Sequence, residues 1–341
     1  MRAIVYEGPY KISVKEIPMP EVREGWALVK VSHAGICGTD LNIYAGTHPR
    51  AKAPLVMSHE FSGTLESDDV NGIAKGEKVT VYPLLSCGGC EPCRSGNAHV
   101  CNSLKLLGID VDGAFAEYVQ VPEKSVIRLP ANVSGLAGAL VEPVAVAVHT
   151  LREKGYKPGD NALIFGCGPI GMSIAITLSV FGSESVLMME TDKARAELAR
   201  EMGFEVFDLS GLSVESFCKE RTGGNGFDWV FDCAGVQPVA DVLFDAVKVK
   251  GKIVVVAGYK KPAAVPLIKG MFKEADMLFV RVYRLGDFAI AAQIVARTPL
   301  YEKMITHVLP VSEAQKGFDL LTTQGTGAVK VMFDFNGGTT S

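Results

Sequence analysis

The sequence predicts an α/β protein of two domains, a β-rich domain and a doubly wound parallel sheet flanked by helices. The chain has 341 residues, 48% of them hydrophobic, which is enough for two cores. Up to about Arg128, short β-branched runs are separated by Gly, Pro and Asn, a pattern typical of antiparallel strands. After the turn at 157–160, strand-like and helix-like runs alternate, which indicates a parallel sheet with helices on both faces.

The expected domain boundaries follow from these patterns. We expect the β-rich domain over residues 1–147 and the parallel-sheet domain over 148–287. The C-terminal segment, 288–341, contains helical stretches and then a strand-like run at Val329–Phe335. We assign this segment back to the β-rich domain.

The charge pattern argues against nucleic-acid or membrane binding. The chain has 34 basic and 38 acidic residues, mixed along its length, so the net charge is -4 and no basic patch is visible. The N-terminus lacks the apolar core of a secretion signal, and the longest apolar stretches are too short or too rich in glycine for a membrane span. We therefore expect a cytoplasmic protein that acts on a small molecule.

Four of the eight cysteines share one loop rich in Gly, Pro and Asn. They are Cys87, Cys90, Cys93 and Cys101. This spacing suits four thiolates around a tetrahedral zinc ion, with an iron–sulfur cluster as the main alternative and four free thiols as a weaker one. Because four sulfurs leave no coordination position open, we expect this zinc to be structural.

A second set of possible metal ligands is more dispersed. Cys37 lies in GICGTDLNIY, His59 and Glu60 lie in PLVMSHEFSG, and Glu142 lies in ALVEPVAVAVHT. A thiolate, an imidazole and a carboxylate can hold zinc and leave one position open, as catalytic zinc sites do. A lone Cys or His is more often a packed residue than a ligand, so it is the combination with the cysteine loop that favours a catalytic zinc.

A glycine motif follows the apolar run Ala162–Phe165 and opens a long apolar helix. It comprises Gly166, Cys167, Gly168, Pro169, Ile170 and Gly171. In this context the motif predicts a dinucleotide site, because the glycines allow a tight turn and a close approach of the pyrophosphate to the helix N-terminus. Glu190 ends the next strand-like run, where a carboxylate binds ribose hydroxyls and repels a 2′-phosphate. NAD is therefore favoured over NADP, and Arg195 is the residue that argues for NADP.

Taken in order, these motifs resemble the zinc-dependent medium-chain dehydrogenase family over nearly the whole chain. The resemblance is carried by Cys37-Gly-Thr-Asp, His59-Glu60, the cysteine loop, GAFAEYV at 113–119, Glu142-Pro143 and GCGPIG at 166–171. The pair Glu142-Pro143 resembles the branch of sorbitol, threonine and sugar-alcohol-phosphate dehydrogenases. The resemblance implies a GroES-like antiparallel β-barrel as the catalytic domain, a Rossmann domain that binds NAD, and a homodimer or homotetramer.

The resemblance also implies roles for single residues. A catalytic zinc would be held by Cys37 and His59, with Glu60 or Glu142 as the third ligand, and Thr39 would take the proton from the substrate hydroxyl. The residues implied to lie along the cofactor are Arg195, Ala257, Gly258, Tyr259, Val280 and Arg281. The implied reaction is hydride transfer to NAD from a secondary alcohol: a polyol, a sugar alcohol or its phosphate, or a β-hydroxy amino acid. An NADP-linked ketone or aldehyde reductase and a non-catalytic NAD-binding relative are the alternatives.

Two positions depart from the family pattern. Ser58 stands where the family usually has Gly, and Asn42 stands where many relatives have the His that ends a proton relay. Because Asn does not titrate, the proton must leave through ribose hydroxyls, water or another group such as His48. Asp40 is interpreted either as an acceptor that orients the His59 ring or as a turn-forming residue. The candidate substrate-pocket residues are Tyr44, His48, Phe115, Arg281 and Arg284, with surface arginines as the alternative for the last two.

Overall fold

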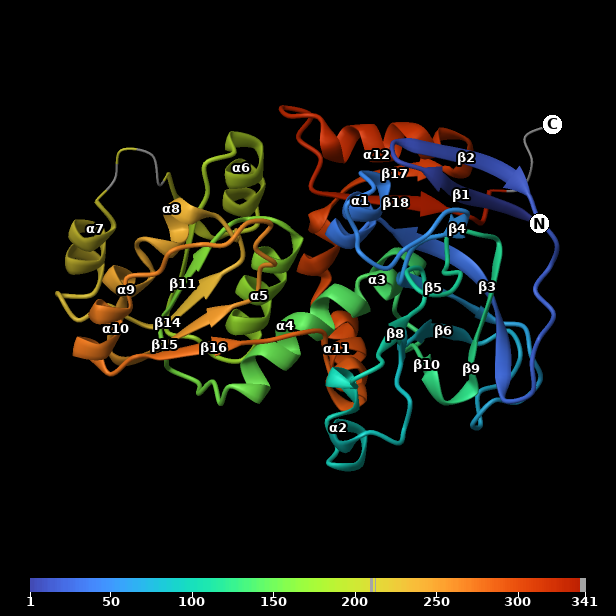
Figure 1. The fold of residues 1–341 in the computed structure, drawn as a ribbon, viewed down its shortest axis with the longest axis horizontal. Coiled ribbons are helices and arrows are strands. Elements are labelled where there is room, and N and C mark those ends of the chain that lie inside the picture. Colours follow the sequence, from blue (N-terminus) through green and yellow to red (C-terminus); the bar gives the residue numbers. More distant parts are fainter. Residues whose placement is uncertain (209–210, 212, 338–341) are drawn as a thin grey trace. The chain divides into compact units, whose positions relative to one another are not determined.

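A computed structural model describes residues 1–208, 211 and 213–337 of the chain. The chain divides into two compact units (Figure 1). The first unit comprises Met1–Ala145 and Arg284–Ser341, and the second is Val146–Tyr283. In the described ranges, no helix is both long and apolar enough to cross a lipid bilayer.

The first unit is built mainly of antiparallel strands. Its seven-stranded sheet has the order β10-β6-β5-β3-β18-β17, with β9 also paired to β3. A three-stranded sheet, β2-β1-β4, and the pair β7-β8 complete the unit. The strands are β1 (Arg2–Gly8), β2 (Lys11–Glu16), β3 (Trp26–Gly35), β4 (Leu55–Val56), β5 (Glu60–Leu65), β6 (Lys78–Val81), β7 (Leu84–Leu85), β8 (Lys105–Leu106), β9 (Tyr118–Pro122), β10 (Val126–Arg128), β17 (Ile305–Pro310) and β18 (Lys330–Asp334).

The C-terminal segment completes the large sheet of the first unit. β18 pairs antiparallel with the end of β3, with Phe333 opposite Ala34. Both residues are fully buried, and the ring of Phe333 packs against that of Phe115 with centroids 5.3 Å apart. The helices that begin in this unit are α1 (Gly38–Tyr44), α2 (Glu91–Arg94), α3 (Gly135–Ala139), α4 (Val141–Glu153), α11 (Leu285–Arg297) and α12 (Ala314–Thr322).

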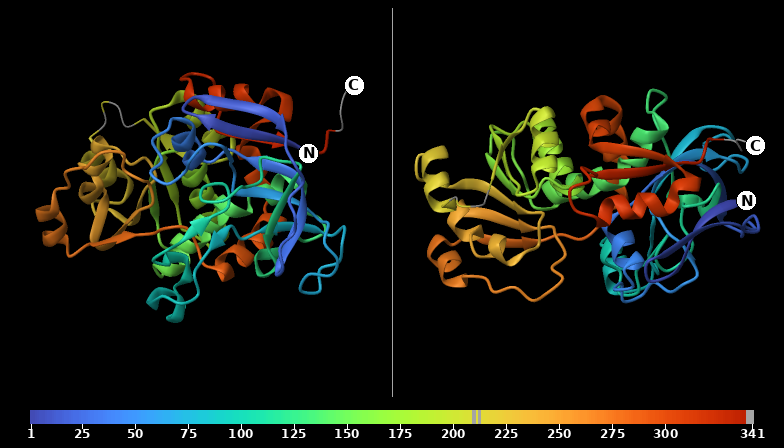
Figure 2. Two further views of the ribbon diagram at one scale, coloured as in Figure 1. Left: turned by 45° about the vertical axis from the view of Figure 1, so that its right-hand side comes forward. Right: turned by 90° about the horizontal axis from the view of Figure 1, so that it is seen from above.

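The second unit is a six-stranded sheet in which every pair is parallel. Its order is β13-β12-β11-β14-β15-β16, and helices lie on both faces (Figure 2). The strands are β11 (Ala162–Phe165), β12 (Val186–Met189), β13 (Glu205–Phe207), β14 (Phe227–Asp232), β15 (Val247–Val255) and β16 (Asp276–Phe279). The helices are α5 (Pro169–Val180), α6 (Lys193–Glu201), α7 (Val214–Arg221), α8 (Gln237–Ala240), α9 (Leu243–Ala246) and α10 (Leu267–Lys273).

This strand order fixes where a ligand can bind in the second unit. The chain runs outward from β11 in one direction and resumes on its other side with β14, so the order reverses at the carboxyl ends of these two strands. Open parallel sheets bind ligands at such a reversal, and this order is that of the Rossmann fold. The expected doubly wound parallel sheet is confirmed. Buried apolar residues from the strands and from α9, such as Leu163, Val230 and Leu243, form its core.

Candidate functional site

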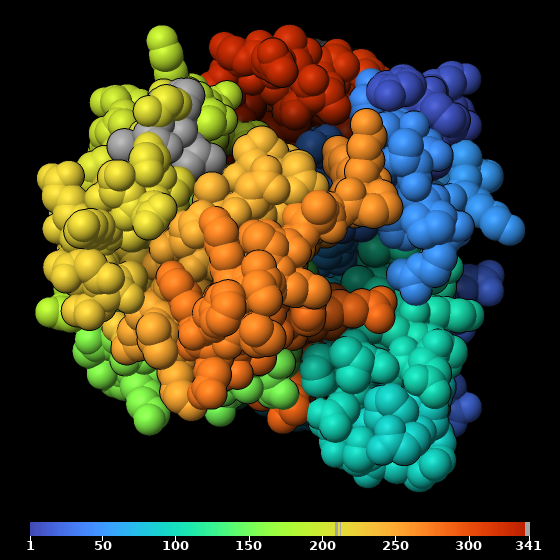
Figure 3. Space-filling view, turned by 60° about the vertical axis from the view of Figure 1, so that its left-hand side comes forward, coloured from blue at the N-terminus to red at the C-terminus, as the bar shows by residue number. Residues whose placement is uncertain are grey.

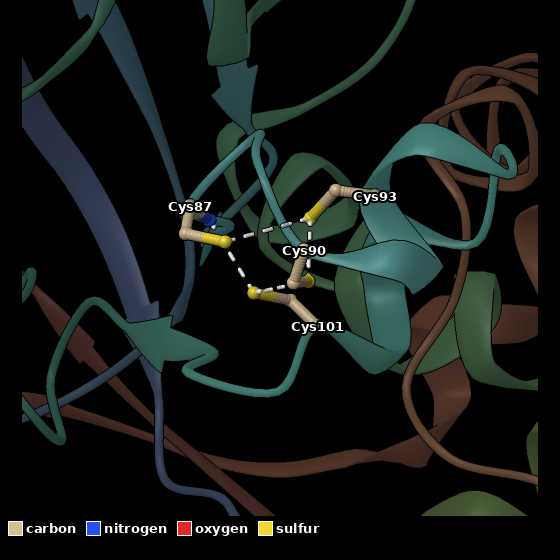
Figure 4. Close-up of side chains that lie close together, drawn as sticks. All are labelled: Cys87, Cys90, Cys93 and Cys101. Atoms are coloured by element: carbon tan, nitrogen blue, oxygen red, sulfur yellow. Dashed lines mark hydrogen bonds between the residues drawn. The ribbon is translucent and has the colours of Figure 1, made fainter.

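The four-cysteine loop lies between β7 and β8, and its sulfurs converge on one point (Figure 4). The sulfur of Cys90 lies 3.4 Å from that of Cys93 and 3.7 Å from that of Cys101, and the sulfurs of Cys87 and Cys93 are 4.0 Å apart. Zinc–sulfur bonds of about 2.3 Å in a tetrahedron place the sulfurs about 3.8 Å from one another. The four residues therefore fit a single zinc ion.

Backbone amides further adapt this loop to thiolates. The N–H of Cys87 donates to the Cys101 sulfur at 3.3 Å. The amides of Gly89 and Cys90 lower the pKa of Cys87 to about 6. A cluster of several iron atoms would hold its cysteines around a larger core than one ion does, so the short sulfur separations favour zinc.

Cys37, His59 and Glu60 form the second group of possible metal ligands. Cys37 is the residue before α1, and its N–H donates to Asp40 Oδ2 at 2.8 Å, which fixes the start of the helix. His59 directly precedes β5, and Glu60 is the first residue of that strand. One ligand atom from each of the three residues lies within 4.8 Å of the other two. His59 and Glu60 are buried, and Cys37 is half-buried.

The polar atoms of this group are suited to a cation. His59 Nδ1 is buried and has no hydrogen-bond partner in the protein, which is uncommon for a buried polar atom. Burial lowers the pKa of His59, but the Cys37 and Asp40 charges outweigh burial and raise it well above its usual value. Burial and the Glu60 charge raise the pKa of Cys37. A divalent cation in this pocket would favour the thiolate and the neutral imidazole.

Lys330, a residue that the sequence analysis did not single out, completes the pocket. It lies on β18, is 1% exposed, and its ammonium donates to Glu60 Oε2 and, at 3.1 Å, to the carbonyl oxygen of Ile36. Burial lowers the pKa of Lys330, but the charges of Glu60 and Cys37 and the hydrogen bond to Glu60 together outweigh burial and raise it, so the lysine is charged. A Cβ atom on Gly35 would lie 2.7 Å from Glu60 Oε2, so only glycine leaves room for this pair. The signal in the sequence was a single charged residue inside the apolar run AVKVMF.

Glu142 and Asp40, the two other acidic residues expected near the metal ligands, differ in their contacts. Glu142 is buried at the start of α4, outside the three-residue group, and its charge contributes to raising the pKa of His59. Asp40 is buried, and its carboxylate accepts the N–H of Cys37 at 2.8 Å and that of Ser58 at 3.4 Å. Asp40 thus fixes the loops that carry the ligands, and its charge also acts on the ring of His59.

Ser58 adopts a backbone conformation that usually requires glycine. Its φ is 76°, and its hydroxyl donates to the carbonyl oxygen of Gly35 at 3.1 Å. A Cβ atom on Gly113 would lie 2.0 Å from the Ser58 carbonyl oxygen, so the turn before His59 is packed directly against another backbone segment. The left-handed turn is therefore formed with serine in place of glycine, and the hydroxyl bond offsets part of its strain.

The proposed proton-transfer residues lie on or after α1. Thr39 is half-buried in the first turn of that helix, and Asn42 lies in the next turn. The carbonyl oxygen of Asn42 accepts the backbone N–H groups of Thr47 and His48, at 2.9 and 3.2 Å. His48 Nδ1 accepts the N–H of Ala51 at 3.2 Å, which leaves Nε2 to carry the proton of the neutral ring.

The pocket candidates outside this group lie in different environments. Tyr44 and Phe115 are buried, and both rings pack against Phe318 in the core. Arg284 Nη2 donates to Asn97 Oδ1 at 2.8 Å, beside the cysteine loop. Arg281 is exposed, directly after β16 and Val280.

The glycine motif lies where the order of the parallel sheet reverses. Gly166 follows β11 with a φ of 103°, and a Cβ atom on Gly171 would lie 1.9 Å from the Gly166 carbonyl oxygen. A Cβ atom on Gly168 would meet nothing within 4 Å, so the backbone there borders open space. Pro169 and Ile170 begin α5, whose N-terminal amides attract phosphate. The residues present therefore fit the pyrophosphate of a dinucleotide.

Glu190 is held by backbone amides at the end of β12. Its Oε2 accepts the N–H of Cys167 at 2.8 Å, and its Oε1 accepts the N–H groups of Thr191 and Asp192 at 2.8 and 2.9 Å. A carboxylate has about four acceptor positions, so one remains on Oε2 for a ribose hydroxyl. Arg195 is half-buried in the first turn of α6. Ala257, Gly258 and Tyr259 follow β15 at the same edge of the sheet.

We expect Lys330→Met to lower the free energy of unfolding by about 3–5 kcal/mol, because Glu60 stays buried without its partner. Denaturant unfolding followed by circular dichroism measures this. The control is Lys316→Met, which removes a lysine paired with Glu313 on the surface and should cost less than about 1 kcal/mol. The double variant Lys330→Met/Glu60→Gln should recover part of the loss, and absence of recovery would contradict a direct pairing.

Comparisons with known proteins agree with this geometry. Residues 23–131 match the alcohol dehydrogenase GroES-like domain, and residues 169–297 match the zinc-binding dehydrogenases. The chain is 35% identical to 2-dehydro-3-deoxy-L-galactonate 5-dehydrogenase of Pseudoalteromonas atlantica, over 93% of this chain and 94% of that protein.

Two solved structures share the fold over nearly the whole chain. An alcohol dehydrogenase from E. coli CFT073 complexed with NADH is 28% identical, with a TM-score of 0.90, and the match covers 98% of this chain and 99% of that one. A zinc-binding dehydrogenase from Sinorhizobium meliloti 1021 bound to NADP is 30% identical, also with a TM-score of 0.90, and the match covers 98% of both chains. The predicted fold class and enzyme class are confirmed, and the chain belongs to the zinc-dependent medium-chain dehydrogenase family, in its sugar-alcohol dehydrogenase-like branch.

Proposed function

We propose that this protein transfers hydride from a secondary alcohol to NAD at a zinc ion held by Cys37, His59 and Glu60. The observation that carries the proposal is the buried group of these three residues, in which His59 Nδ1 has no partner in the protein. Bound zinc would act as a Lewis acid that lowers the pKa of the substrate hydroxyl. The substrate is a polyol, a sugar alcohol or its phosphate, or a β-hydroxy amino acid.

Residues around the proposed zinc ligands hold these ligands in position. Asp40 holds the N–H of Cys37 and so sets the direction of the thiol at the start of α1. Lys330 binds Oε2 of Glu60, so Oε1 is the oxygen that this bond leaves available to a metal. Glu142 is a second carboxylate whose charge reaches His59, so it is the alternative third ligand. Thr39 would accept the substrate proton, and Asn42 is unable to receive it as a base.

The four-cysteine loop would hold a second zinc ion with a structural role. Four sulfurs fill a tetrahedron, so no position remains for a substrate. The loop has little regular structure of its own, since its helix α2 is only four residues long. Bound zinc would therefore stabilise it.

For the cofactor, Glu190 favours NAD over NADP. Its remaining acceptor position suits a ribose hydroxyl, and its charge would repel a 2′-phosphate. NADP is the second candidate, because the similar Sinorhizobium meliloti protein was solved with NADP and because Arg195 lies in the first turn of α6, the helix that follows Glu190.

The proposed reaction can be tested by elemental analysis and by NADH formation on a panel of polyols, sugar phosphates, β-hydroxy amino acids and simple secondary alcohols. We expect two zinc ions per chain, one for each ligand group.

Cys37→Ser should remove one zinc and lower activity by at least about 100-fold. Cys90→Ser should remove the other zinc and lower the melting temperature, whereas Cys218→Ser, a buried cysteine of the second unit, should retain both zinc ions. Full activity after treatment with a strong chelator would contradict the proposal.

We expect Glu190→Ala to reduce the preference for NAD over NADP by at least about tenfold, since the variant loses a charged acceptor and a repulsive charge. The ratio of kcat/KM for the two cofactors measures the change. Glu197→Ala removes an exposed carboxylate of the neighbouring helix α6 and should leave the ratio unchanged. An unchanged ratio in Glu190→Ala would show that the cofactor is selected elsewhere.

We also propose that the protein forms a homo-oligomer through β16 and α10. β16 is the last strand of its sheet, so its outer edge offers backbone groups to a second copy. The segment from α10 to β16, coloured orange, is open on the surface in the space-filling view (Figure 3). Its exposed apolar residues are Leu267, Ile268, Met271, Phe272 and Phe279. Two copies related by a twofold axis would pair their β16 strands and cover these side chains.

The double variant Phe272→Asp/Phe279→Asp should convert the oligomer into monomers, because it places charges where apolar contacts would form. Light scattering coupled to size-exclusion chromatography measures the mass. Val14→Asp, on an exposed position of β2, should keep the mass of the unmodified protein. A monomeric unmodified protein, or an oligomer that survives the double substitution, would overturn this interface.

A further inference from the structure

The last residue of β14, Asp232, is a buried carboxylate that accepts hydrogen bonds from two loops of the second unit. It is fully buried. Its Oδ1 accepts the N–H groups of Ala234 and Gly235 at 3.1 and 2.9 Å. Its backbone carbonyl accepts the N–H groups of Val256 and Ala257, both at 3.0 Å. One residue therefore binds the loop after β14 and the start of the loop after β15.

The other oxygen of this carboxylate is bound by Tyr259. The tyrosine hydroxyl donates to Asp232 Oδ2 at 2.5 Å. Burial, the hydrogen bond to Asp232 and the Asp232 charge raise the pKa of Tyr259 well above its usual value, so the hydroxyl keeps its proton at neutral pH. Hydrogen bonds to a charged acceptor are stronger than those between neutral groups. Tyr259 is thus a permanent donor that ties the second loop back to β14.

The two loops held in this way also touch each other. Gly235 has a φ of 65°, and a Cβ atom there would lie 3.0 Å from the Cβ of Ala257 and 3.4 Å from the Gly258 carbonyl oxygen. Any displacement of Tyr259 therefore moves a backbone segment that is in contact with the first loop. A side chain at position 235 would therefore press against Ala257 and Gly258.

This arrangement adjoins the glycine motif. The N–H of Cys233 donates to the carbonyl oxygen of Phe165, the last residue of β11, at 2.9 Å. A Cβ atom on Gly166 would lie 3.3 Å from the Cys233 carbonyl carbon. The loop after β14 therefore begins beside the backbone proposed to bind the pyrophosphate, on the side away from Glu190, which follows β12.

We infer that Asp232 and Tyr259 are a positioning pair that holds residues 233–235 and 257–258 in the conformation that binds the nicotinamide–ribose half of the dinucleotide. The inference rests on the proposed NAD-binding function. In this proposal the pair touches neither the substrate carbon nor the nicotinamide carbon between which hydride passes. It acts through the backbone of the two loops. Glu190 lies beyond the pyrophosphate in the other direction, so the adenosine half of the dinucleotide does not depend on the pair.

This separation gives a test that distinguishes positioning from general stability. Affinities for NADH and for 5′-AMP are measured by fluorescence and by calorimetry on the purified full chain, for the unmodified protein and for Tyr259→Phe. We expect the dissociation constant of NADH to rise about tenfold, the effect of losing one hydrogen bond to a charged group, and that of 5′-AMP to change by less than about twofold. Tyr10→Phe, an exposed tyrosine of the first unit, is the matched control and should change neither.

Asp232→Asn is the second variant, because an amide keeps the size of the side chain while removing its charge. It should weaken NADH binding in the same way and leave 5′-AMP binding intact. Unchanged NADH affinity in Tyr259→Phe would overturn the inference, and so would an equal loss of both ligands, which would indicate a structural role only. Failure of the unmodified protein to bind NADH would instead overturn the proposed function on which the inference rests.

Discussion

The ion pair between Lys330 and Glu60 is the interaction on which the first unit depends. The two residues are 270 positions apart in the chain, and both are buried. β3 lies between their strands, and its last residue, Gly35, pairs with Glu60 on one side and Met332 on the other. Removing one partner of a buried pair leaves an uncompensated charge, so the C-terminal strand stabilises the N-terminal residues proposed to bind a metal. This stabilisation explains why the first unit is built from both ends of the chain.

The charges around the Lys330–Glu60 pair are suited to a bound cation. Around His59 lie the thiol of Cys37 and the buried carboxyls of Asp40 and Glu60, and the charge of the buried Glu142 also acts on its ring, against the ammonium of Lys330. Burial, together with the Glu60 charge, raises the pKa of Cys37 and of Asp40, the latter to about 6, and one lysine does not offset this effect. A divalent cation supplies the missing positive charge and removes the tendency of these groups to hold protons. The pocket is thus selected for a cation by its charge as well as by its ligand atoms.

The sequence predicted those parts of the site that depend on local spacing. The four cysteines lie in one loop, and the glycines lie between one strand and the next helix, so each pattern is visible within a few residues. The structure brings each set together. Lys330 was missed because its partner lies on a strand that only the folded sheet places nearby. The same limit applies to Asp232 and Tyr259, whose hydrogen bond joins two loops. Tyr44 and Phe115 were expected at the substrate, yet both are core residues, since an aromatic residue in a loop motif looks the same in either role.

In both units, acidic side chains fix loops before any ligand is bound. Glu190 accepts three backbone amides, Asp232 accepts two, and Asp40 accepts two. Asp40 lies in the first turn of α1, Asp232 is the last residue of β14 and Glu190 directly follows β12, so each transfers the rigidity of a strand or helix to the loop beside it. A loop ordered during folding loses little further entropy when a ligand binds, which favours affinity. The affinity of these loops for a ligand therefore depends on residues whose main contacts are with the protein itself.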